Sequence, residues 1–319
     1  MSVIAATPVS DLPLTRASVQ AAHERIKPHI HLTPSLTSRT LDRFASTPRS
    51  TESEGIKNAR SVRVVDAAAP VVRMLFKCEN LQRGGAFKIR GATHAHPPSQ
   101  PPPVVMPRIS TPSKIAATQS YGATVVFSGS TAPEREAAVC AEQARTGATL
   151  VPPYDHPFIL LGQGTVALEL IDQAREAGRP LDAIIAPCGG GGLLSGIATA
   201  CRGTGVRVFG AEPRKDGAND CQRGLRRGKR VEEVRTLTIA DGLRTPTGAT
   251  TYAIIEEAVD GVFSVTEWEI LMAREGGEKG WNVGVVFSGG NTTVEVLAGL
   301  FAREGEFMGE QEELMKERE

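Results

Sequence analysis

Four consecutive glycines, Gly189 to Gly192, stand in the segment CGGGGLLSG between an apolar run and a helical pattern. Residues without a Cβ let several backbone N–H groups converge on one anion, and the following helix adds a favourable partial charge. We therefore expect Gly189, Gly190, Gly191, Gly192 and Leu193 to bind a phosphate group. The segment lacks the Gly-Lys-Ser/Thr ending of a P-loop and does not match GxGxxG with its acidic residue. A flexible turn is the alternative, which the entropic cost of four glycines disfavours.

A lysine in the segment KCENLQRGGAFKIRGA, residues 77 to 92, is the second chemical candidate. Lys88 follows Phe87 and opens a predicted helix, where the helix dipole and partial burial both disfavour the ammonium form. A neutral lysine is a Schiff-base nucleophile. Taken alone, a lysine at a helix start is most often a surface residue. Together with a phosphate-binding loop, it indicates an aldehyde cofactor that carries a phosphate, pyridoxal 5′-phosphate (PLP).

A third motif, FSGGN at residues 287 to 291, follows an apolar strand. Ligands of open α/β sheets bind at the carboxyl ends of strands. Ser288 can offer a neutral hydroxyl to the pyridine nitrogen of PLP, which weakens the ring as an electron sink and favours elimination or racemisation over transamination. Alternatively, the motif is a simple turn in which Asn291 caps the next helix.

The elements around these motifs alternate between strands and helices, as in an α/β protein with parallel sheets. Thr15 is the expected N-cap of the first helix. Strands are predicted near residues 71–77, 102–107, 123–129, 148–154, 181–187, 206–213 and 281–287. Helices are predicted near residues 15–30, 86–95, 111–122, 132–147, 162–178, 192–203 and 289–301.

The composition excludes several classes of partner. Lys plus Arg and Asp plus Glu number 36 each, so no net charge attracts nucleic acid or an anionic membrane. The chain has no basic leader followed by an apolar core and no apolar run long enough to span a bilayer. Five cysteines show no CxxC or zinc-type spacing and are interpreted as reduced packing residues. We expect a cytoplasmic protein that binds a small molecule.

In this order the three motifs resemble those of the fold-type II PLP enzymes (tryptophan synthase beta-like), specifically the serine/threonine dehydratase and serine racemase branch. The resemblance extends from HLTPSLTSRTLD to FSGGNTTVE. It implies an α/β fold of two lobes, each with a mostly parallel sheet flanked by helices. Residues 1–100 and 155–319 would form the large PLP-binding domain, residues 101–154 a truncated small domain, and the protein a homodimer.

The resemblance also implies roles for individual residues. Lys88 would carry the cofactor and exchange the α-proton of the substrate, with Phe87 packed beside the ring. The glycine loop with Leu193 would hold the phosphate, and Ser288 would face the pyridine nitrogen. Gly242, in the segment TIADGLRTPTG, would lie near the cofactor.

The segment GAEPRKDGANDC is similar to the one that holds a divalent cation in this branch. This implies Glu212, the Ala218 carbonyl and Asp220 as oxygen ligands for Mg²⁺ or Ca²⁺. The spacing is longer than the family pattern, and a surface loop with unpaired carboxylates is the alternative.

Two family segments are missing. Members of the branch follow the lysine helix with a strand, a loop reading Ser-Ser-Gly-Asn-His, and a further helix, whereas this chain passes from Thr93 through HAHPPSQPPP into the later strand. Residues 265–291 are also shorter, so each place lacks roughly one βα unit of ~30 residues. Residues 46–70 conversely look like a polar, poorly ordered insertion.

The expected reaction is β-elimination from L-serine or L-threonine, which gives a 2-oxo acid and ammonia. In the family, the missing loop holds the substrate carboxylate and carries a serine on the face opposite the lysine and an asparagine that meets the phenolic oxygen of the cofactor. Weak or no turnover is therefore predicted. Racemisation is the less favoured activity for the same reason. The alternatives are a non-catalytic PLP-binding paralogue, a mis-spliced or wrongly assembled gene product and, more remotely, a Rossmann nucleotide-binding protein.

Overall fold

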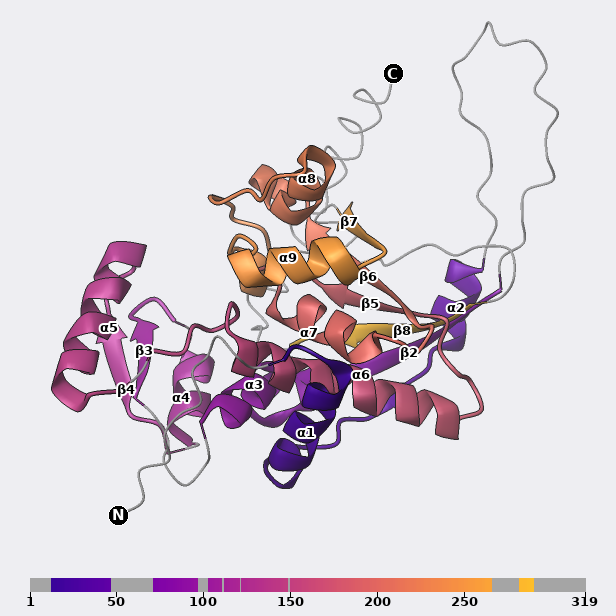
Figure 1. Ribbon diagram of the computed structural model, residues 1–319, viewed down its shortest axis with the longest axis horizontal. Helices are drawn as coiled ribbons and strands as arrows, with labels where there is room; N and C mark the ends of the chain where they lie inside the picture. Colours follow the sequence, from indigo (N-terminus) through magenta and orange to yellow (C-terminus); the bar gives the residue numbers. More distant parts are fainter. Residues whose placement is uncertain are drawn as a thin grey trace, which may run out of the picture.

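The computed structural model describes residues 13–46, 71–96, 103–110, 112–120, 122–148, 150–265 and 281–289, and contains two sheets of different size (Figure 1). The larger sheet has the order β1-β2-β8-β5-β6-β7, and the smaller one pairs β3 with β4. All pairs are parallel except β1 with β2. The strands are β1 (Ser35–Leu36), β2 (Val72–Cys78), β3 (Val104–Pro107), β4 (Val125–Ser128), β5 (Ala183–Pro187), β6 (Arg207–Pro213), β7 (Gly261–Val265) and β8 (Trp281–Phe287).

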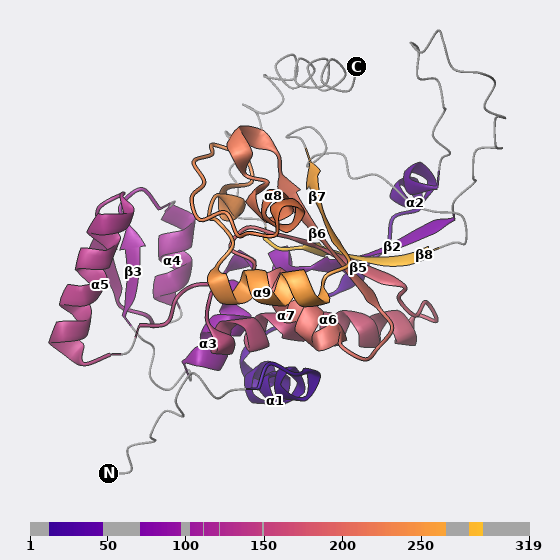
Figure 2. The ribbon, with the colours of Figure 1, turned by 45° about the horizontal axis from the view of Figure 1, so that its top comes forward.

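Helices cover both faces of the larger sheet, which confirms the predicted α/β class. Figure 2 shows α1, α3, α6, α7 and α9 on one side and α2 and α8 on the other, while α4 and α5 flank the smaller sheet. The helices are α1 (Arg16–Ile26), α2 (Arg39–Ala45), α3 (Lys88–Ala95), α4 (Pro112–Ser120), α5 (Ala132–Thr146), α6 (Pro157–Glu176), α7 (Gly192–Cys201), α8 (Asp220–Arg227) and α9 (Ala249–Ala258). Short 3₁₀ turns are η2 (Lys27–His29), η3 (Glu79–Leu81), η4 (Arg83–Gly85), η5 (Lys215–Gly217) and η6 (Asp241–Leu243).

Helix ends follow local capping signals. The Thr15 side chain accepts a hydrogen bond from the Ser18 backbone, which confirms the predicted N-cap of α1. Helix α5 begins with a capping box between Thr131 and Glu134 and ends at Gly147, whose φ of 69° is left-handed.

Two predicted elements near residue 155 were wrong. The strand predicted for residues 148–154 does not occur in the described part of that range. The following helix was predicted to begin at Gly162, but α6 begins at Pro157, and the His156 ring accepts a hydrogen bond from the Phe158 backbone. A proline at the first helical position is a normal start signal, and the glycines that follow it obscured that signal.

The glycines inside α6 let it pack closely on its neighbours. A Cβ at Gly162 would lie 2.6 Å from the Gly91 Cα in α3. A Cβ at Gly164 would lie 2.5 Å from the Gly196 carbonyl oxygen in α7. Helix α6 thus joins the helix that begins with Lys88 to the helix that follows the glycine loop, and α6 and α7 share one buried core.

The strand order brings the three sequence motifs to one edge of the sheet. Strand β8 lies between β2 and β5, and all three are parallel. Their carboxyl ends therefore face the same way, as in other open α/β sheets with a ligand site. The Lys88 segment follows β2, the glycine loop follows β5, and Ser288 follows β8.

The connection from α3 to the smaller sheet is short. Helix α3 ends at Ala95 and β3 begins at Val104. The eight residues between them cannot contain a strand, a loop and a helix, which need about 30 residues.

The expected insertion beyond Ser46, most of the second shortened segment (266–280 and 290–291) and the charged C-terminal tail lie outside the described residues. Within the described ranges, no helix combines the length and apolar character that crossing a membrane requires.

Candidate active site

The Lys88 segment is hydrogen-bonded directly to the Ser288 segment. The Phe87 N–H donates to the Ser288 carbonyl at 3.1 Å. Ala86 and Gly289 form an antiparallel bridge beside this bond. The Lys88 Nζ lies 5.3 Å from the centre of the Phe87 ring. Two of the three motifs therefore meet in space at the carboxyl ends of their strands, although about 200 residues separate them in the sequence.

The environment of Lys88 lowers the pKa of its amine. Lys88 is exposed to solvent, yet the protein atoms around it remove part of the hydration of its side chain. This desolvation lowers the pKa of Lys88, the charge of Lys114 lowers it further, and Asp241 acts in the opposite direction. Lys114 on α4 and Asp241 on η6 form an ion pair at 2.5 Å. The direction of the pKa shift agrees with the expectation from the sequence.

The glycine loop presents free backbone donors. Residues 189–193 are buried, and their N–H groups donate to no acceptor among the described residues. The first N–H groups of a helix have no partner within it, which accounts for Gly192 and Leu193. The N–H groups of Gly189, Gly190 and Gly191 add to them, and buried donors without a partner are rare in proteins. Five consecutive free donors at a helix start fit the phosphate of PLP.

Residues outside the predicted site hold the loop in place. The Gly190 carbonyl accepts hydrogen bonds from the Gly248 N–H at 3.2 Å and from the Thr251 Oγ1 at 2.8 Å. A Cβ at Gly190 would lie 2.4 Å from a ring carbon of Tyr154, and Gly191 has a φ of 86°. Close packing and backbone conformation therefore both require glycine here. Nothing in the sequence signalled the contribution of Tyr154 or Thr251.

Gly242 and Ser288 complete the set of predicted cofactor-binding residues. A Cβ at Gly189 would lie 2.9 Å from the Leu243 Cα and 3.2 Å from the Gly242 carbonyl oxygen, so η6 borders the glycine loop. At Gly242 itself a Cβ would meet no atom within 4 Å. The Ser288 hydroxyl makes no hydrogen bond to a described residue and is free to face a ring nitrogen. A lysine, an anion-binding loop and a neutral hydroxyl at one sheet edge fit the aldehyde, phosphate and pyridine groups of PLP.

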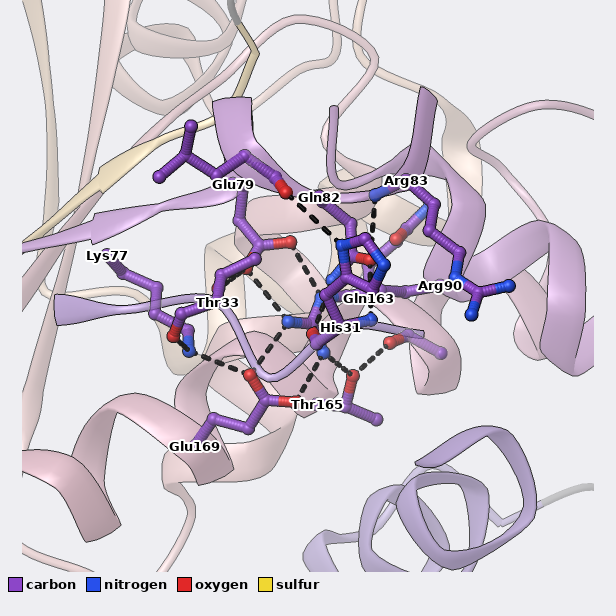
Figure 3. Close-up of polar contacts among 12 residues, drawn as sticks. His31, Thr33, Lys77, Glu79, Gln82, Arg83, Arg90, Gln163, Thr165 and Glu169 are labelled. Atoms are coloured by element: carbon purple, nitrogen blue, oxygen red, sulfur yellow. Dashed lines mark hydrogen bonds and ion pairs between the residues drawn. The ribbon is translucent and has the colours of Figure 1, made fainter. Parts of the chain in front are cut away.

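A buried network of charges surrounds Arg90, which is two residues from Lys88 on α3 (Figure 3). The Arg90 guanidinium forms bidentate pairs with Glu79, at 2.7 and 2.8 Å, and with Glu169, at 2.8 Å for both bonds. The Lys77 Nζ lies 2.7 Å from Glu169 and donates to the Thr33 carbonyl at 2.6 Å. Strand β2, turn η3 and helices α3 and α6 each contribute one charged residue to this network.

The four charges compensate one another. Two cations face two carboxylates, and Lys77, Glu79 and Arg90 are fully buried. Burial raises the pKa of Glu169, but hydrogen bonds and charge from Arg90, together with Lys77, outweigh it and lower the pKa. Because Arg90 is two residues from Lys88 on α3, the network fixes the helix that carries the lysine. The sequence alone did not indicate this network, because isolated Lys, Arg and Glu residues are expected at protein surfaces.

The predicted cation ligands lie near the end of β6. The Glu212 carboxylate accepts from the backbone of Cys221 at 3.2 Å and of Gln222 at 2.7 Å. Asp220 accepts two hydrogen bonds from Thr247, at 2.8 and 2.9 Å. Burial raises the pKa of Glu212 to about 9, to which the charge of Asp220 contributes, and burial also raises the pKa of Asp220.

The Ala218 carbonyl, in a fully buried residue, accepts no hydrogen bond from the described residues. A carbonyl without a donor beside two buried carboxylates fits a hard cation such as Mg²⁺ or Ca²⁺.

Comparison with known proteins points to one family. The family described as "Pyridoxal-phosphate dependent enzyme" matches residues 101–308. Serine racemase of Schizosaccharomyces pombe is 33% identical over 341 positions, which cover 89% of this chain and 96% of that protein. L-threo-3-hydroxyaspartate ammonia-lyase of Saccharomyces cerevisiae is 35% identical over 290 positions, 81% of this chain and 79% of that protein. The structure of a T.th. threonine deaminase superposes with a TM-score of 0.71 at 32% identity and covers 88% of this chain and 99% of that one.

The comparison with the S. pombe enzyme also bears on the missing segments. That alignment is 341 positions long, whereas this chain has 319 residues, so some positions of the relative have no counterpart here. This agrees with the short connection between α3 and β3. Sequence identity, a shared fold and the geometry around Lys88 lead to the same conclusion: the chain belongs to the fold-type II pyridoxal-phosphate dependent enzymes, among the serine racemases and threonine deaminases.

Proposed function

We propose that this protein is a PLP-dependent ammonia-lyase that acts on L-serine or L-threonine by β-elimination. The observation that supports it best is the convergence of Lys88, the glycine loop and Ser288 at one sheet edge. Similar proteins are named as racemases and ammonia-lyases that act on serine, threonine or hydroxyaspartate. A neutral hydroxyl at Ser288 favours elimination or racemisation over transamination.

The residues of this chain would have separate tasks. When bound, PLP supplies an electron sink that makes the α-proton of an amino acid acidic. The N–H groups of residues 189–193 bind the phosphate and thereby fix the position of the cofactor. Lys88, with its lowered pKa, would hold the cofactor through Nζ and would carry a proton to and from the α-carbon of the substrate. Phe87 would pack beside the cofactor ring.

The absent strand–loop–helix unit limits this activity. In the family it supplies the clamp for the substrate carboxylate and a serine on the face opposite the lysine. We therefore propose weak or no turnover, with racemisation less favoured than elimination. A non-catalytic PLP-binding paralogue is the second candidate, because the missing unit is the substrate and asparagine loop while Lys88, the glycine loop and Ser288 are retained.

Further properties of this protein remain proposals. Glu212, the Ala218 carbonyl and Asp220 would bind Mg²⁺ or Ca²⁺. The two sheets would mark a large domain of residues 1–100 and 155–319 and a small domain of residues 101–154. A homodimer and a cytoplasmic location are predictions from the resemblance and the sequence.

Cofactor binding and turnover can be tested separately on the purified full-length protein. PLP is expected to give a visible absorption band, and borohydride should fix the cofactor on Lys88, which peptide mass spectrometry would locate. Lys88→Ala should lose the adduct, whereas the surface variant Lys27→Ala should keep it.

Pyruvate formed from serine, or 2-oxobutyrate formed from threonine, would support the lyase. A Lys88 adduct without turnover would favour the non-catalytic paralogue. A colourless protein that takes up no PLP would contradict both functions and support a defective gene product.

A further inference from the structure

Two thiols and a carboxylate meet below the glycine loop. The Sγ atoms of Cys188 and Cys221 and a carboxylate oxygen of Glu212 all lie within 4.8 Å of one another. All three residues are about 1% exposed. Cys188 follows β5, Glu212 belongs to β6, and Cys221 lies in the first turn of α8. The cysteines were expected only to pack in the core, because their sequence spacing shows no metal-binding pattern.

The spacing suits a tetrahedral metal ion. In a zinc site with Zn–S bonds of about 2.3 Å, two sulfur ligands are about 3.8 Å apart. The two Sγ atoms of this protein are at most 4.8 Å apart. This is about 1 Å more than in such a site, and small side-chain rotations can close the difference. Elsewhere in the described part of the chain, no other group of three His, Cys, Asp or Glu side chains is this close.

The ligands are held in position by backbone hydrogen bonds. The Cys188 N–H donates to the Ala211 carbonyl at 2.8 Å and thereby fixes Cys188 beside β6. The Glu212 carboxylate accepts from the Cys221 and Gln222 backbone at the start of α8. Outer hydrogen bonds of this kind orient ligands in metal sites.

We propose that Cys188, Cys221 and Glu212 bind a thiophilic divalent cation such as Zn²⁺. Both thiols and the protonated Glu212 carboxyl group lose their protons to solvent on binding, and a water molecule completes the tetrahedron. The donor set differs from the three oxygens suggested for Mg²⁺ or Ca²⁺, since thiolates select soft ions and disfavour hard ones. Glu212 belongs to both sets, so the two ions compete. Bound Zn²⁺ would join the glycine loop to β6 and α8.

Binding can be tested on full-length, metal-free protein kept under a non-thiol reductant. Cd²⁺ is the first probe, because its thiolate complexes absorb in the ultraviolet, and competition with a chelating dye would give the affinity for Zn²⁺. One equivalent of each ion should bind. Cys188→Ser and Cys221→Ser should each lose the thiolate absorption and weaken Zn²⁺ binding by at least about tenfold. Two control variants are Cys201→Ser, which changes a buried cysteine in α7, and Cys140→Ser, which changes an exposed one. Both should leave the thiolate absorption and the affinity for Zn²⁺ unchanged.

A measurement on the unmutated protein covers the case in which a variant does not fold. Zn²⁺ should slow alkylation of Cys188 and Cys221, read by mass spectrometry, while the buried Cys78 and Cys201 serve as internal controls. A hundredfold excess of Mg²⁺ should not restore the alkylation rate if the thiols hold the ion. Equal alkylation rates with and without Zn²⁺, or unchanged Cd²⁺ absorption in both site variants, would overturn the proposal. Neither readout depends on PLP or turnover, so failure here is distinct from failure of the proposed lyase activity.

Discussion

Lys88 lies between two charges that act on it in opposite directions. Lys114 favours the neutral amine, whereas Asp241 favours the ammonium form, and the two neighbours are paired with each other. Substituting one of them also leaves the other without its ion-pair partner. This increases the effect of the substitution on the pKa of Lys88. Helix α4, which flanks the smaller sheet, therefore acts on the pKa of Lys88 through this pair.

The charge pair leads to two pH predictions of opposite sign. Only the neutral amine attacks the PLP aldehyde, so the rate of PLP uptake by apoprotein should rise with pH through the pKa of Lys88. Lys114→Met should move this profile to higher pH, because it removes the charge that lowers the pKa. Asp241→Asn should move it to lower pH, each by less than about one pH unit. Stopped-flow absorbance would measure the profiles, and shifts in the same direction for both variants would contradict this account.

Gly191 combines a left-handed backbone with close packing. A Cβ there would lie 2.8 Å from the Thr251 Cβ, and φ is 86°. Gly203→Ala is a matched control, because Gly203 has a φ of 74° and open space around it. The control should lose about 1–2 kcal/mol of stability from backbone strain alone. Gly191→Ala should lose about 1–3 kcal/mol more and bind PLP more weakly. Urea unfolding and PLP titration measure the two effects, and equal losses in both variants would show that Thr251 does not constrain the loop.

At the residue scale, the sequence predicted groups whose chemistry depends on residue type. Four glycines, a lysine after Phe87 and a serine after an apolar strand led to the predicted cofactor site, which stays a prediction. The sequence could not predict contacts between side chains that are far apart along the chain. Cys188 and Cys221 meet only because β5 pairs with β6 and α8 begins beside β6. Tyr154 likewise reaches the glycine loop through a segment that had been predicted as a strand.

At the scale of elements, the buried charge network connects β2, η3, α3 and α6. One available signal was the position of Lys77 within the apolar run of β2, since a charge in a buried strand needs a partner. Glu79 and Arg90, which pair with each other, follow in the same motif as Lys88. Glu169, however, lies in α6, and its pairing could not be predicted without the strand and helix positions.

Breaking this network should destabilise the protein in a pH-dependent way. Glu169→Gln leaves Lys77 and Arg90 short of a buried counter-charge and should cost about 3–5 kcal/mol at neutral pH. In the parent, the lowered pKa of Glu169 contributes stability that is present above the unfolded value of about 4.3 and is lost as pH falls through the folded value. The variant should therefore show a smaller loss of stability on acidification. Denaturant unfolding at several pH values measures both effects.

Asp172→Asn is the control for that experiment. Asp172 also pairs with an arginine, Arg175, but on the surface of α6. Solvent screens such pairs, so this variant should behave like the parent. A similar loss of unfolding free energy in Glu169→Gln and in the control would mean that the buried network stabilises the protein no more than a surface ion pair does.

At the scale of the whole molecule, the site has cofactor residues without the substrate loop. The large sheet contains all three motifs, and the small sheet has two strands in the described part of the chain. The eight-residue connection after α3 stands where the family has a strand, a loop and a helix. Because binding and turnover depend on different parts of the chain, the protein can retain the first and lack the second.

Restoring the loop should restore catalysis. A chimera in which residues 96–103 are replaced by the corresponding unit of the S. pombe serine racemase should form pyruvate from serine faster than the parent. Continuous assay of pyruvate, with PLP occupancy measured in parallel, separates loss of binding from loss of turnover. A chimera that folds and binds PLP yet remains as slow as the parent would show that the second shortened segment also limits activity. A parent with full activity would contradict the role given to the loop.

The position of β8 determines when this protein can mature. Strand β8 is the last described strand to be synthesised, yet it lies between β2 and β5 and supplies Ser288 to the site. Until the ribosome has released residues 281–289, β2 cannot pair with β8. Strands β1 and β2 therefore remain apart from β5, β6 and β7. At translation rates of about 5–20 residues per second, most of the chain waits many seconds for its central strand. Because the proposed site includes Ser288, PLP uptake is expected only after β8 has joined the sheet, and until then exposed strand edges favour chaperone binding.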